Sequence, residues 1–313
     1  MDWCSTRFAL LVTLVLASLA AGCRSAPVTG RRQMLLMPET QEVSMGLTSY
    51  QDIVAKEPAS TNEAYVEMVE RVGQRIAAVA DKPDYHWEFR VIASDVQNAF
   101  CLPGGKVAIY EGILPICENE AGLAVVMSHE VAHALARHGG ERMSQSLAVD
   151  GVKQAVSYAT QKQDETRREI LLKAYGVASE YGVILPYSRK HESEADHIGL
   201  MLMAKAGYDP SEAPRFWQRF AIAQQGQKPL EFLSTHPSDA RRASDLESLL
   251  PEAMQLYVSA PTRLGLGEGL AASHRPAPPS PSQSPVTPAS MSAPQSVAAV
   301  KNWWSPQLLA PPK

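Results

Sequence analysis

The sequence predicts a mainly α-helical domain of the α+β class with one small β-sheet. Apolar residues recur at helical spacing through most of residues 39–258, which indicates a series of amphipathic helices. Residues 87–109 instead alternate with a period of two, which is typical of strands. With 313 residues, of which 45% are hydrophobic and 20% charged, the chain is long enough to bury a sizeable core.

Two helices are expected at the start of this domain. The first spans residues 39–55. The second opens with a capping-box pattern, Ser60 followed by Glu63, and its apolar positions keep helical spacing up to residue 79. The polar run 81–83 then ends this second helix.

The small sheet is expected next. Residues 87–92 alternate in character, and residues 107–109 follow a Pro-Gly-Gly turn at 103–105. Two short strands are therefore predicted, with residues 94–102 lying between them.

A long helix is expected at residues 118–137, ended by the Gly pair at 139–140. An irregular helical stretch follows from 141 to 182, and its polar patch at 161–168 indicates a turn. Pro186 breaks this stretch.

Three more helices complete the predicted domain. One covers residues 188–205, and the next is capped by Asp209 with Pro210 at its first position. The last helix follows residues 236–238 and fades near residue 250.

The long helix carries the pattern His129-Glu130-x-x-His133. Residues four apart on a helix lie one above the other, so both imidazoles can reach a single metal ion, with Glu130 beside it. A hydrolytic zinc site needs a third protein ligand and an open fourth position. Glu192 is the strongest candidate, because Glu192 and Asp196 share one face of the 188–205 helix. One carboxylate can then bind the metal while the other orients a ligand histidine.

An ordered set of motifs gives the chain a resemblance to the prenyl-protease-type (CAAX-type) zinc metallopeptidases. It resembles the exported lipoprotein branch, BepA and LoiP, more than HtpX or the mitochondrial Oma-type proteases. The motifs span about residues 28–250 and are Val28-Thr29-Gly30-Arg31-Arg32-Gln33, Asn98-Ala99-Phe100, Leu102-Pro103-Gly104-Gly105, His129-Glu130-x-x-His133, Glu192-x-x-x-Asp196 and Ser234-Thr235-His236-Pro237. The sequence departs from the family pattern at His197, where Arg is frequent, and no tetratricopeptide domain follows.

The resemblance implies a zincin-like (gluzincin) fold and one Zn²⁺ per chain. It assigns His129, His133 and Glu192 as metal ligands, Glu130 as the catalytic carboxylate and Asp196 as a residue that orients a ligand. Glu194 does not fall on the ligand position. The expected activity is hydrolysis of peptide bonds.

Two further residues are candidates for the catalytic chemistry. The oxyanion that forms at the scissile carbonyl needs a hydrogen-bond donor, and His236 is the candidate, with Arg242 as its partner. His236 is also able to occupy the fourth zinc position and hold the enzyme inactive. Both interpretations remain open from the sequence.

Residues Asn98, Ala99 and Phe100 are expected at the edge of the sheet, where an extended peptide could add as a strand. The alternative is that Phe100 belongs to the core and Asn98 to a turn. Backbone recognition tolerates many sequences, so unfolded or misassembled envelope proteins are the expected substrates. The rival hypotheses are a membrane-anchored chaperone or assembly factor with little proteolysis, and an inert structural lipoprotein.

The first residues indicate export. Residues 8–21 are apolar and too short to span a bilayer, so residues 1–22 are interpreted as a signal peptide. The ending Leu19-Ala20-Ala21-Gly22-Cys23 resembles a lipobox, which makes Cys23 a lipidation site and residues 23–38 a lipidated tether. An ordinary cleaved signal is the alternative. Arg24 after this Cys fits sorting to the outer membrane, on its periplasmic side.

Composition constrains the partners. A net charge of −4 and a pI near 6.1 provide no basic surface for nucleic acid. The sequence leaves open whether Cys101 and Cys117 form a disulfide. Residues 259–313 are rich in Pro, Ser and Ala and predict a disordered tail, with a docking peptide at Trp303-Trp304 as the alternative.

Overall fold

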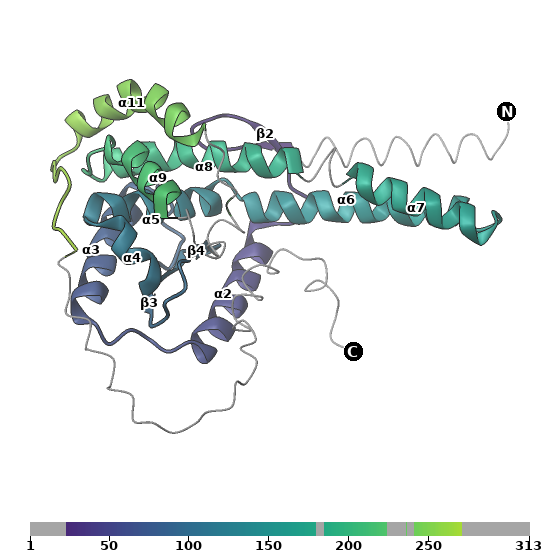
Figure 1. Cartoon of the computed structure of the whole chain (residues 1–313), viewed down its shortest axis with the longest axis horizontal. Helices are drawn as coiled ribbons and strands as arrows, with labels where there is room; N and C mark the ends of the chain where they lie inside the picture. Colours follow the sequence, from purple (N-terminus) through teal and green to yellow (C-terminus); the bar gives the residue numbers. More distant parts are fainter. Residues whose placement is uncertain (1–22, 180–184, 224–235, 237–240, 271–313) are drawn as a thin grey trace.

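The computed structural model describes residues 23–179, 185–223, 236 and 241–270, and Figure 1 shows how their elements are arranged. The strands are β1 (Cys23–Ser25), β2 (Arg32–Met34), β3 (Glu88–Ile92), β4 (Ala99–Leu102) and β5 (Lys106–Tyr110). The helices are α2 (Glu39–Lys56), α3 (Glu63–Val79), η1 (Glu111–Ile113), α4 (Leu114–Cys117), α5 (Glu120–Leu135), α6 (His138–Ala159), α7 (Glu165–Ser179), α8 (Leu185–Lys205), α9 (Glu212–Ala223) and α11 (Arg242–Ser259). The predicted mainly helical α+β class is confirmed.

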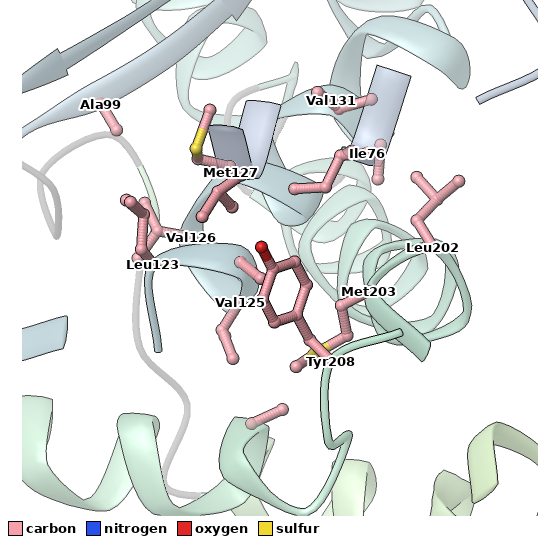
Figure 2. Packing of buried hydrophobic residues seen from close by; sticks show 14 of the residues in the cluster. Ile76, Ala99, Leu123, Val125, Val126, Met127, Val131, Leu202, Met203 and Tyr208 are labelled. Carbon is pink, nitrogen blue, oxygen red and sulfur yellow. The ribbon is translucent and has the colours of Figure 1, made fainter. Parts of the chain in front are cut away.

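Helix α5 forms the centre of the fold. All its residues except His133 are buried, as expected for a helix that is apolar on every side. It packs against α3, α8, α9 and strand β4. Met127 and Val131 of this helix belong to the same hydrophobic cluster as Ile76 of α3 and Met203 of α8, and Figure 2 shows this cluster from close by. Truncating such a residue to Ala costs about 2–5 kcal/mol, so the core fixes α5 in place.

The main sheet has the strand order β3-β5-β4. Strand β3 runs parallel to β5, pairing Phe89 with Val107, and β4 runs antiparallel to β5, pairing Phe100 with Ala108. The two predicted strands are confirmed, and β4 is a third strand in the stretch expected to connect them. Strand β4 lies at the edge of the sheet and against α5.

The segment expected to be a tether folds onto the domain instead. Strands β1 and β2 pair antiparallel, and alternate residues Gln33, Leu35 and Met37 are buried. The amide of Leu36 also donates to the hydroxyl of Ser144 on α6, at 2.9 Å. The apolar residues that end this segment therefore pack against the domain. Their burial stabilises the fold because it removes apolar area from water. The expected signal peptide lies outside the described residues.

Two helix ends differ from the sequence prediction. Asn62, and not Ser60, caps α3 by accepting a hydrogen bond from the amide of Tyr65. Helix α5 ends because Arg137 adopts a left-handed conformation with φ of 55°, and residues 139–140 then lie in the first turn of α6. Arg137 is held there by the buried carboxylate of Glu42, so a tertiary ion pair replaces the expected glycine.

The other helix predictions agree more closely. A turn separates α6 from α7 as predicted, but it ends before Glu165, so residues 165–168 of the predicted turn belong to α7. These two helices run side by side away from the rest of the domain (Figure 1). The side chain of Asp209 accepts from the amide of Ser211 at the start of α9. Within the described part of the chain, none of the helices combines the length and apolar character needed to cross a bilayer.

The C-terminal boundary lies later than predicted. Helix α11 continues through Pro251 to Ser259, because Ala253 beyond the proline is buried in the core. Residues 260–270, expected to belong to the disordered tail, pack back onto the domain. The amide of Leu264 donates to the carbonyl of Gly207, and the amide of Ala121 donates to the carbonyl of Leu266. The rest of the predicted tail, with Trp303-Trp304, lies outside the described residues.

The two described cysteines of the core do not form a disulfide. Cys101 on β4 and Cys117 on α4 are both free and buried. Burial raises the pKa of each thiol above its ordinary value. The structure thus favours the free-thiol alternative.

Candidate metal centre

Helix α5 presents His129 and His133 on one face. Their Nε2 atoms lie 3.1 Å apart, and the rings meet edge to face. The four-residue spacing predicted this arrangement. His129 is 2% exposed, so its imidazole is removed from bulk water and must be satisfied by protein groups or a ligand.

Helix α8 supplies the carboxylate of Glu192 beside these rings. Its Oε2 atom lies 3.3 Å from Nε2 of His129, and its Oε1 atom lies 3.5 Å from Nε2 of His133. The side chain is 4% exposed. Burial alone would raise the pKa of Glu192, but the neighbouring charges of His236 and His133 and hydrogen bonds from histidines hold it well below its ordinary value.

Asp196 lies one helical turn after Glu192 and contacts the side of the His129 ring that faces away from the other ligand atoms. Its Oδ1 atom is 3.0 Å from Nδ1 of that histidine. Burial would lower the pKa of His129, yet hydrogen bonds to Asp196 and Glu192 raise it to about 9. The two carboxylates therefore favour positive charge at this point, which is the condition that a metal cation requires.

Arg242, at the start of α11, fixes Asp196 in turn. Its Nε and Nη2 atoms donate to the two carboxylate oxygens of Asp196 at 2.7 and 2.6 Å, the paired geometry that guanidinium groups favour. The guanidinium also lies 3.6 Å from the ring centroid of Trp217. Arg242 was expected to assist His236; its two shortest hydrogen bonds go to Asp196, and its Nη2 atom also lies 3.4 Å from Nδ1 of His129.

His236 completes a ring of four side chains. Its Nδ1 atom is 3.1 Å from Oε2 of Glu192 and 3.3 Å from Nε2 of His129. One ligand atom from each of His129, His133, Glu192 and His236 falls within 4.8 Å of all the others. His236 stands in the position of a fourth ligand, which matches one of its two interpretations from the sequence.

Glu130 lies beside this ring. Its Oε1 atom is 3.3 Å from Nε2 of His236, and its side chain is buried. Burial raises the pKa of Glu130, partly offset by His236 and His129. A carboxylate with a raised pKa is a stronger proton acceptor than one in water, as a general base requires.

One buried atom shows that the residues fit a metal. Oε1 of Glu192 is buried without a hydrogen-bond partner among the described residues. A buried carboxylate oxygen in that state costs free energy unless a ligand satisfies it. Two imidazoles, a carboxylate and a further imidazole are ligand types that suit zinc.

A pocket opens next to the candidate ligands. Its lining includes Glu130, His133, Glu192 and His236 together with Asn98 and Ala99 at the start of β4. The predicted site residues thus meet in one place, except Cys23, whose backbone lies in β1. Nδ2 of Asn98 is buried and has no hydrogen-bond partner in the described residues. Phe100 is 4% exposed and belongs to a core cluster, so its interpretation as a core residue is favoured.

Sequence reasoning missed a buried polar cluster behind His133. The Nδ1 atom of His138 lies 2.8 Å from Nδ1 of His133, and its Nε2 atom lies 2.9 Å from Oε2 of Glu194. Burial lowers the pKa of His138 to about 4. Two features of the sequence belong to this cluster: the motif that contains Arg31, and Glu194 in the acidic run. Neither feature indicates that Arg31 and Glu194 contact each other.

The family model for peptidase family M48 matches residues 63–250. Among characterised proteins, the chain is similar to the mitochondrial metalloendopeptidase OMA1 of Schizosaccharomyces pombe, at 38% identity over 72% of this chain and 66% of that protein. It is also similar to OMA1 of Saccharomyces cerevisiae, at 33% identity over 77% of this chain and 75% of that protein. The β-barrel assembly-enhancing protease of Escherichia coli matches at 26% over 72% and 49%.

These identities bear on the branch expected from the sequence. The two mitochondrial proteins match at higher identity than the Escherichia coli protein, so the expected nearness to the exported lipoprotein branch is not confirmed. The chain spans just under two thirds of the Schizosaccharomyces pombe protein and about half of the Escherichia coli one.

Proposed function

Because the chain belongs to peptidase family M48 and is thus a metallopeptidase of the hydrolase class, we propose that it is a zinc-dependent endopeptidase acting on unfolded or misassembled proteins. Its fold is the zincin-like α+β fold that the sequence predicted. The observation that carries the proposal is the convergence of His129, His133, Glu192 and His236 on one point, beside Glu130.

His129, His133 and Glu192 would hold the zinc ion. When bound there, zinc lowers the pKa of water and polarises the carbonyl of the scissile bond. Asp196 accepts from Nδ1 of His129, which leaves Nε2 of that ring free to face the metal. Arg242 keeps Asp196 in this orientation through its paired hydrogen bonds.

Glu130 carries the proton in this mechanism. It accepts a proton from the attacking water and passes it to the amine of the leaving peptide. Burial raises the pKa of Glu130, which makes its carboxylate a better proton acceptor for the first of these steps. No other described carboxylate of the pocket suits the task, since Glu192 is a ligand and Glu42 is paired with Arg137.

His236 would regulate access to the metal. With Nδ1 among the ligand atoms, it fills the fourth position that a hydrolytic zinc site needs for water. The pocket beside the ligand atoms has a volume of about 70 Å³ and is open on one side. Displacement of His236 from the ligand position would free that position for water, and the displaced imidazole would be available as the predicted oxyanion donor.

The edge strand β4 would bind the substrate. An extended peptide laid along this edge would meet Asn98, whose buried Nδ2 is an unused hydrogen-bond donor in the pocket lining. Recognition through main-chain hydrogen bonds requires an unfolded segment and places few demands on its sequence. This supports unfolded proteins as the substrate class.

The cellular setting is part of the proposal. A signal peptide with lipidation at Cys23 would anchor the enzyme to the outer membrane on the periplasmic side. The substrates would then be envelope proteins, and the task protein quality control. The name of the Escherichia coli relative, a β-barrel assembly-enhancing protease, is in keeping with such a role.

The test is a comparison of zinc content and cleavage in the chain from residue 24 onward. We expect one zinc per chain in the wild type and in Glu130→Gln, with cleavage of an unfolded protein such as reduced casein by the wild type alone. His236→Ala should cleave faster than the wild type if His236 only closes the site, and more slowly if His236 also serves as the oxyanion donor. Absence of zinc from folded protein would contradict the site assignment.

The alternative function is a membrane-anchored chaperone or assembly factor with little proteolysis. The position of His236 among the ligand atoms favours this candidate, because it occupies the place that the attacking water needs. Stoichiometric zinc with no cleavage by either the wild type or His236→Ala, together with suppressed aggregation of an unfolded protein, would support it.

A further inference from the structure

The motif at residues 28–33 has no role in the proposed function. Residues 28–33 carry part of the family resemblance, yet they lie outside the zinc ligands and the cleft. In the structure, residues 26–31 form the turn that joins β1 to β2. This turn brings Thr29 and Arg31 to Glu194 on α8, more than 160 residues later in the chain.

Arg31 is the centre of this contact. Its Nε atom donates to Oε2 of Glu194 at 2.8 Å, while Nη1 and Nη2 donate to the two oxygens of Glu141 at 3.0 and 2.6 Å. The hydroxyl of Thr29 donates to the other oxygen of Glu194. Both carboxylates are almost fully buried, at 5% and 1% exposed, so Arg31 neutralises charge that water does not reach.

Glu194 connects this turn to the metal centre. Its Oε2 atom lies 2.9 Å from Nε2 of His138, and Nδ1 of His138 lies 2.8 Å from Nδ1 of His133. His138 is 3% exposed and stacks on the ring of His191 at 4.3 Å. A continuous chain of close contacts therefore runs from Arg31 through Glu194 and His138 to a metal ligand.

The direction of the hydrogen bonds follows from the chemistry of each group. An ionised carboxylate only accepts, so Nε2–H of His138 donates to Glu194. A neutral His138 then has a lone pair on Nδ1, and Nδ1–H of His133 donates to it. The lone pair of His133 is thereby left on Nε2, the atom that lies among the other ligand atoms. The opposite order would place a proton on Nε2 and prevent binding to zinc.

We propose that His138 is a positioning residue for the zinc ligand His133, and that Thr29 and Arg31 of the β1–β2 turn hold it in place through Glu194. The proposal rests on the proposed zinc site. His138 does for His133 what Asp196 does for His129, with an imidazole in place of a carboxylate. Residues after Cys23 are thus an integral part of the metal centre.

The test measures zinc affinity in the folded chain from residue 24 onward, by competition with a chelating dye. His138→Phe keeps a ring that can stack on His191 but removes the acceptor for His133. Loss of such an orienting partner weakens metal binding by about 10- to 100-fold. His138→Asn, which retains an acceptor near the position of Nδ1, should recover part of the affinity.

His191→Phe is the matched control. His191 is fully buried and stacks on the same ring, and its Nε2 atom lies 2.9 Å from Oε2 of Glu141, not on the path from Glu194 through His138 to His133. We expect it to lose stability as His138→Phe does while binding zinc within about threefold of the wild type. His138 also lines the pocket, so zinc affinity, and not KM, is the readout that separates the two variants.

Arg31→Lys tests the turn, with the neighbouring exposed Arg32→Lys as its control. The single ammonium group of lysine cannot reproduce the planar guanidinium, whose several donors bond to both carboxylates at once. We therefore expect weaker zinc binding in Arg31→Lys and no change in Arg32→Lys. Nitrogen-15 NMR of labelled histidines should show His133 bound through Nε2 in the wild type and a mixture of tautomers in Arg31→Lys. If His138→Phe does not fold, the comparison of Arg31→Lys with Arg32→Lys tests the proposal by itself.

The outcomes separate the two proposals. A wild type that binds no zinc contradicts the proposed function. A wild type that binds zinc, with equal affinity in His138→Phe and His191→Phe or in Arg31→Lys and Arg32→Lys, overturns the role of the turn and of His138 and leaves the zinc site intact.

Discussion

The backbone of Gly199 on α8 lies directly against the backbone of His129 on α5. A Cβ atom at position 199 would come within 3.0 Å of the amide nitrogen of His129 and 3.1 Å of its Cα. A Cβ atom there would be closer than nearly all such contacts in proteins, so the backbone of α5 would have to shift by a few tenths of an ångström. The absence of a side chain therefore allows α8 to bring Glu192 and Asp196 close enough to the histidine pair.

Gly199→Ala should separate the two helices at the metal centre. We expect weaker zinc binding and a lower melting temperature, because the contact is with backbone, which cannot rotate away. Gly151→Ala on α6 is the control, since nothing lies within 4 Å of its Cβ position. There the substitution should stabilise the helix by up to about 1 kcal/mol. Equal zinc affinity in both variants would show that the close approach is not needed.

Arg242→Lys should weaken the metal centre without changing a ligand. Lysine keeps the charge but loses the paired hydrogen bonds to Asp196 and the stacking on Trp217. We expect at least about a tenfold loss of zinc affinity. Arg215→Lys is the control, because that exposed arginine pairs with Glu212 at 3.6 Å and not with Asp196. The idea fails if the two variants bind zinc equally well.

Residues 260–270 should contribute measurably to stability. They accept hydrogen bonds from the amides of Glu120 and Ala121 at the start of α5 and bond to Gly207 and Asp209. Each such bond contributes about 1 kcal/mol. A chain ending at residue 259 should therefore unfold at lower urea concentration than one ending at residue 270. Identical unfolding midpoints would contradict the packing of this segment.

The buried carboxylates near Arg31 should make the metal-free protein sensitive to acid. Burial would raise the pKa of Glu141, but hydrogen bonds from His191 and Arg31 lower it to about 2, against an ordinary value of 4.5. A folded pKa below the unfolded one adds stability above about pH 4.5 that is lost as the pH falls toward 2. Glu194 behaves in the same way, with a pKa of about 2.

The measurement is urea unfolding between pH 7 and pH 3 in the presence of a chelator, so that zinc release does not contribute. Glu141→Gln should be less stable than the wild type at pH 7, and the difference should shrink with falling pH. A difference that stays constant across this range would mean that the carboxylate is not selectively stabilised in the folded state.

Local sequence patterns predicted the parts of the site that depend on local geometry. The spacing of His129 and His133, and of Glu192 and Asp196, places each pair on one helix face whatever surrounds it. The role of His138 could not be predicted, because its partner Glu194 lies 56 residues away in sequence and Arg31, which binds Glu194, lies 163 residues from it. Gly199 likewise has no pattern of its own, since only the packing of α5 on α8 makes it necessary.

The boundaries of the domain show the same limit. Residues 260–270 have a loop-like composition, and their order comes from hydrogen bonds to Gly207 and to the start of α5. The segment after Cys23 was expected to be a tether, because three-residue strands carry too short a pattern to recognise. Both segments become ordered only through tertiary contacts.

X-ray absorption at the zinc edge of the purified chain is the most direct test of the metal centre. The account predicts a first shell of nitrogen and oxygen at about 2.0–2.1 Å, with outer-shell scattering from two imidazoles and a third when His236 is bound. His236→Ala should show two. A shell that contains sulfur at about 2.3 Å, or one that lacks imidazole scattering, would contradict the assignment of His129, His133 and Glu192 as the zinc ligands.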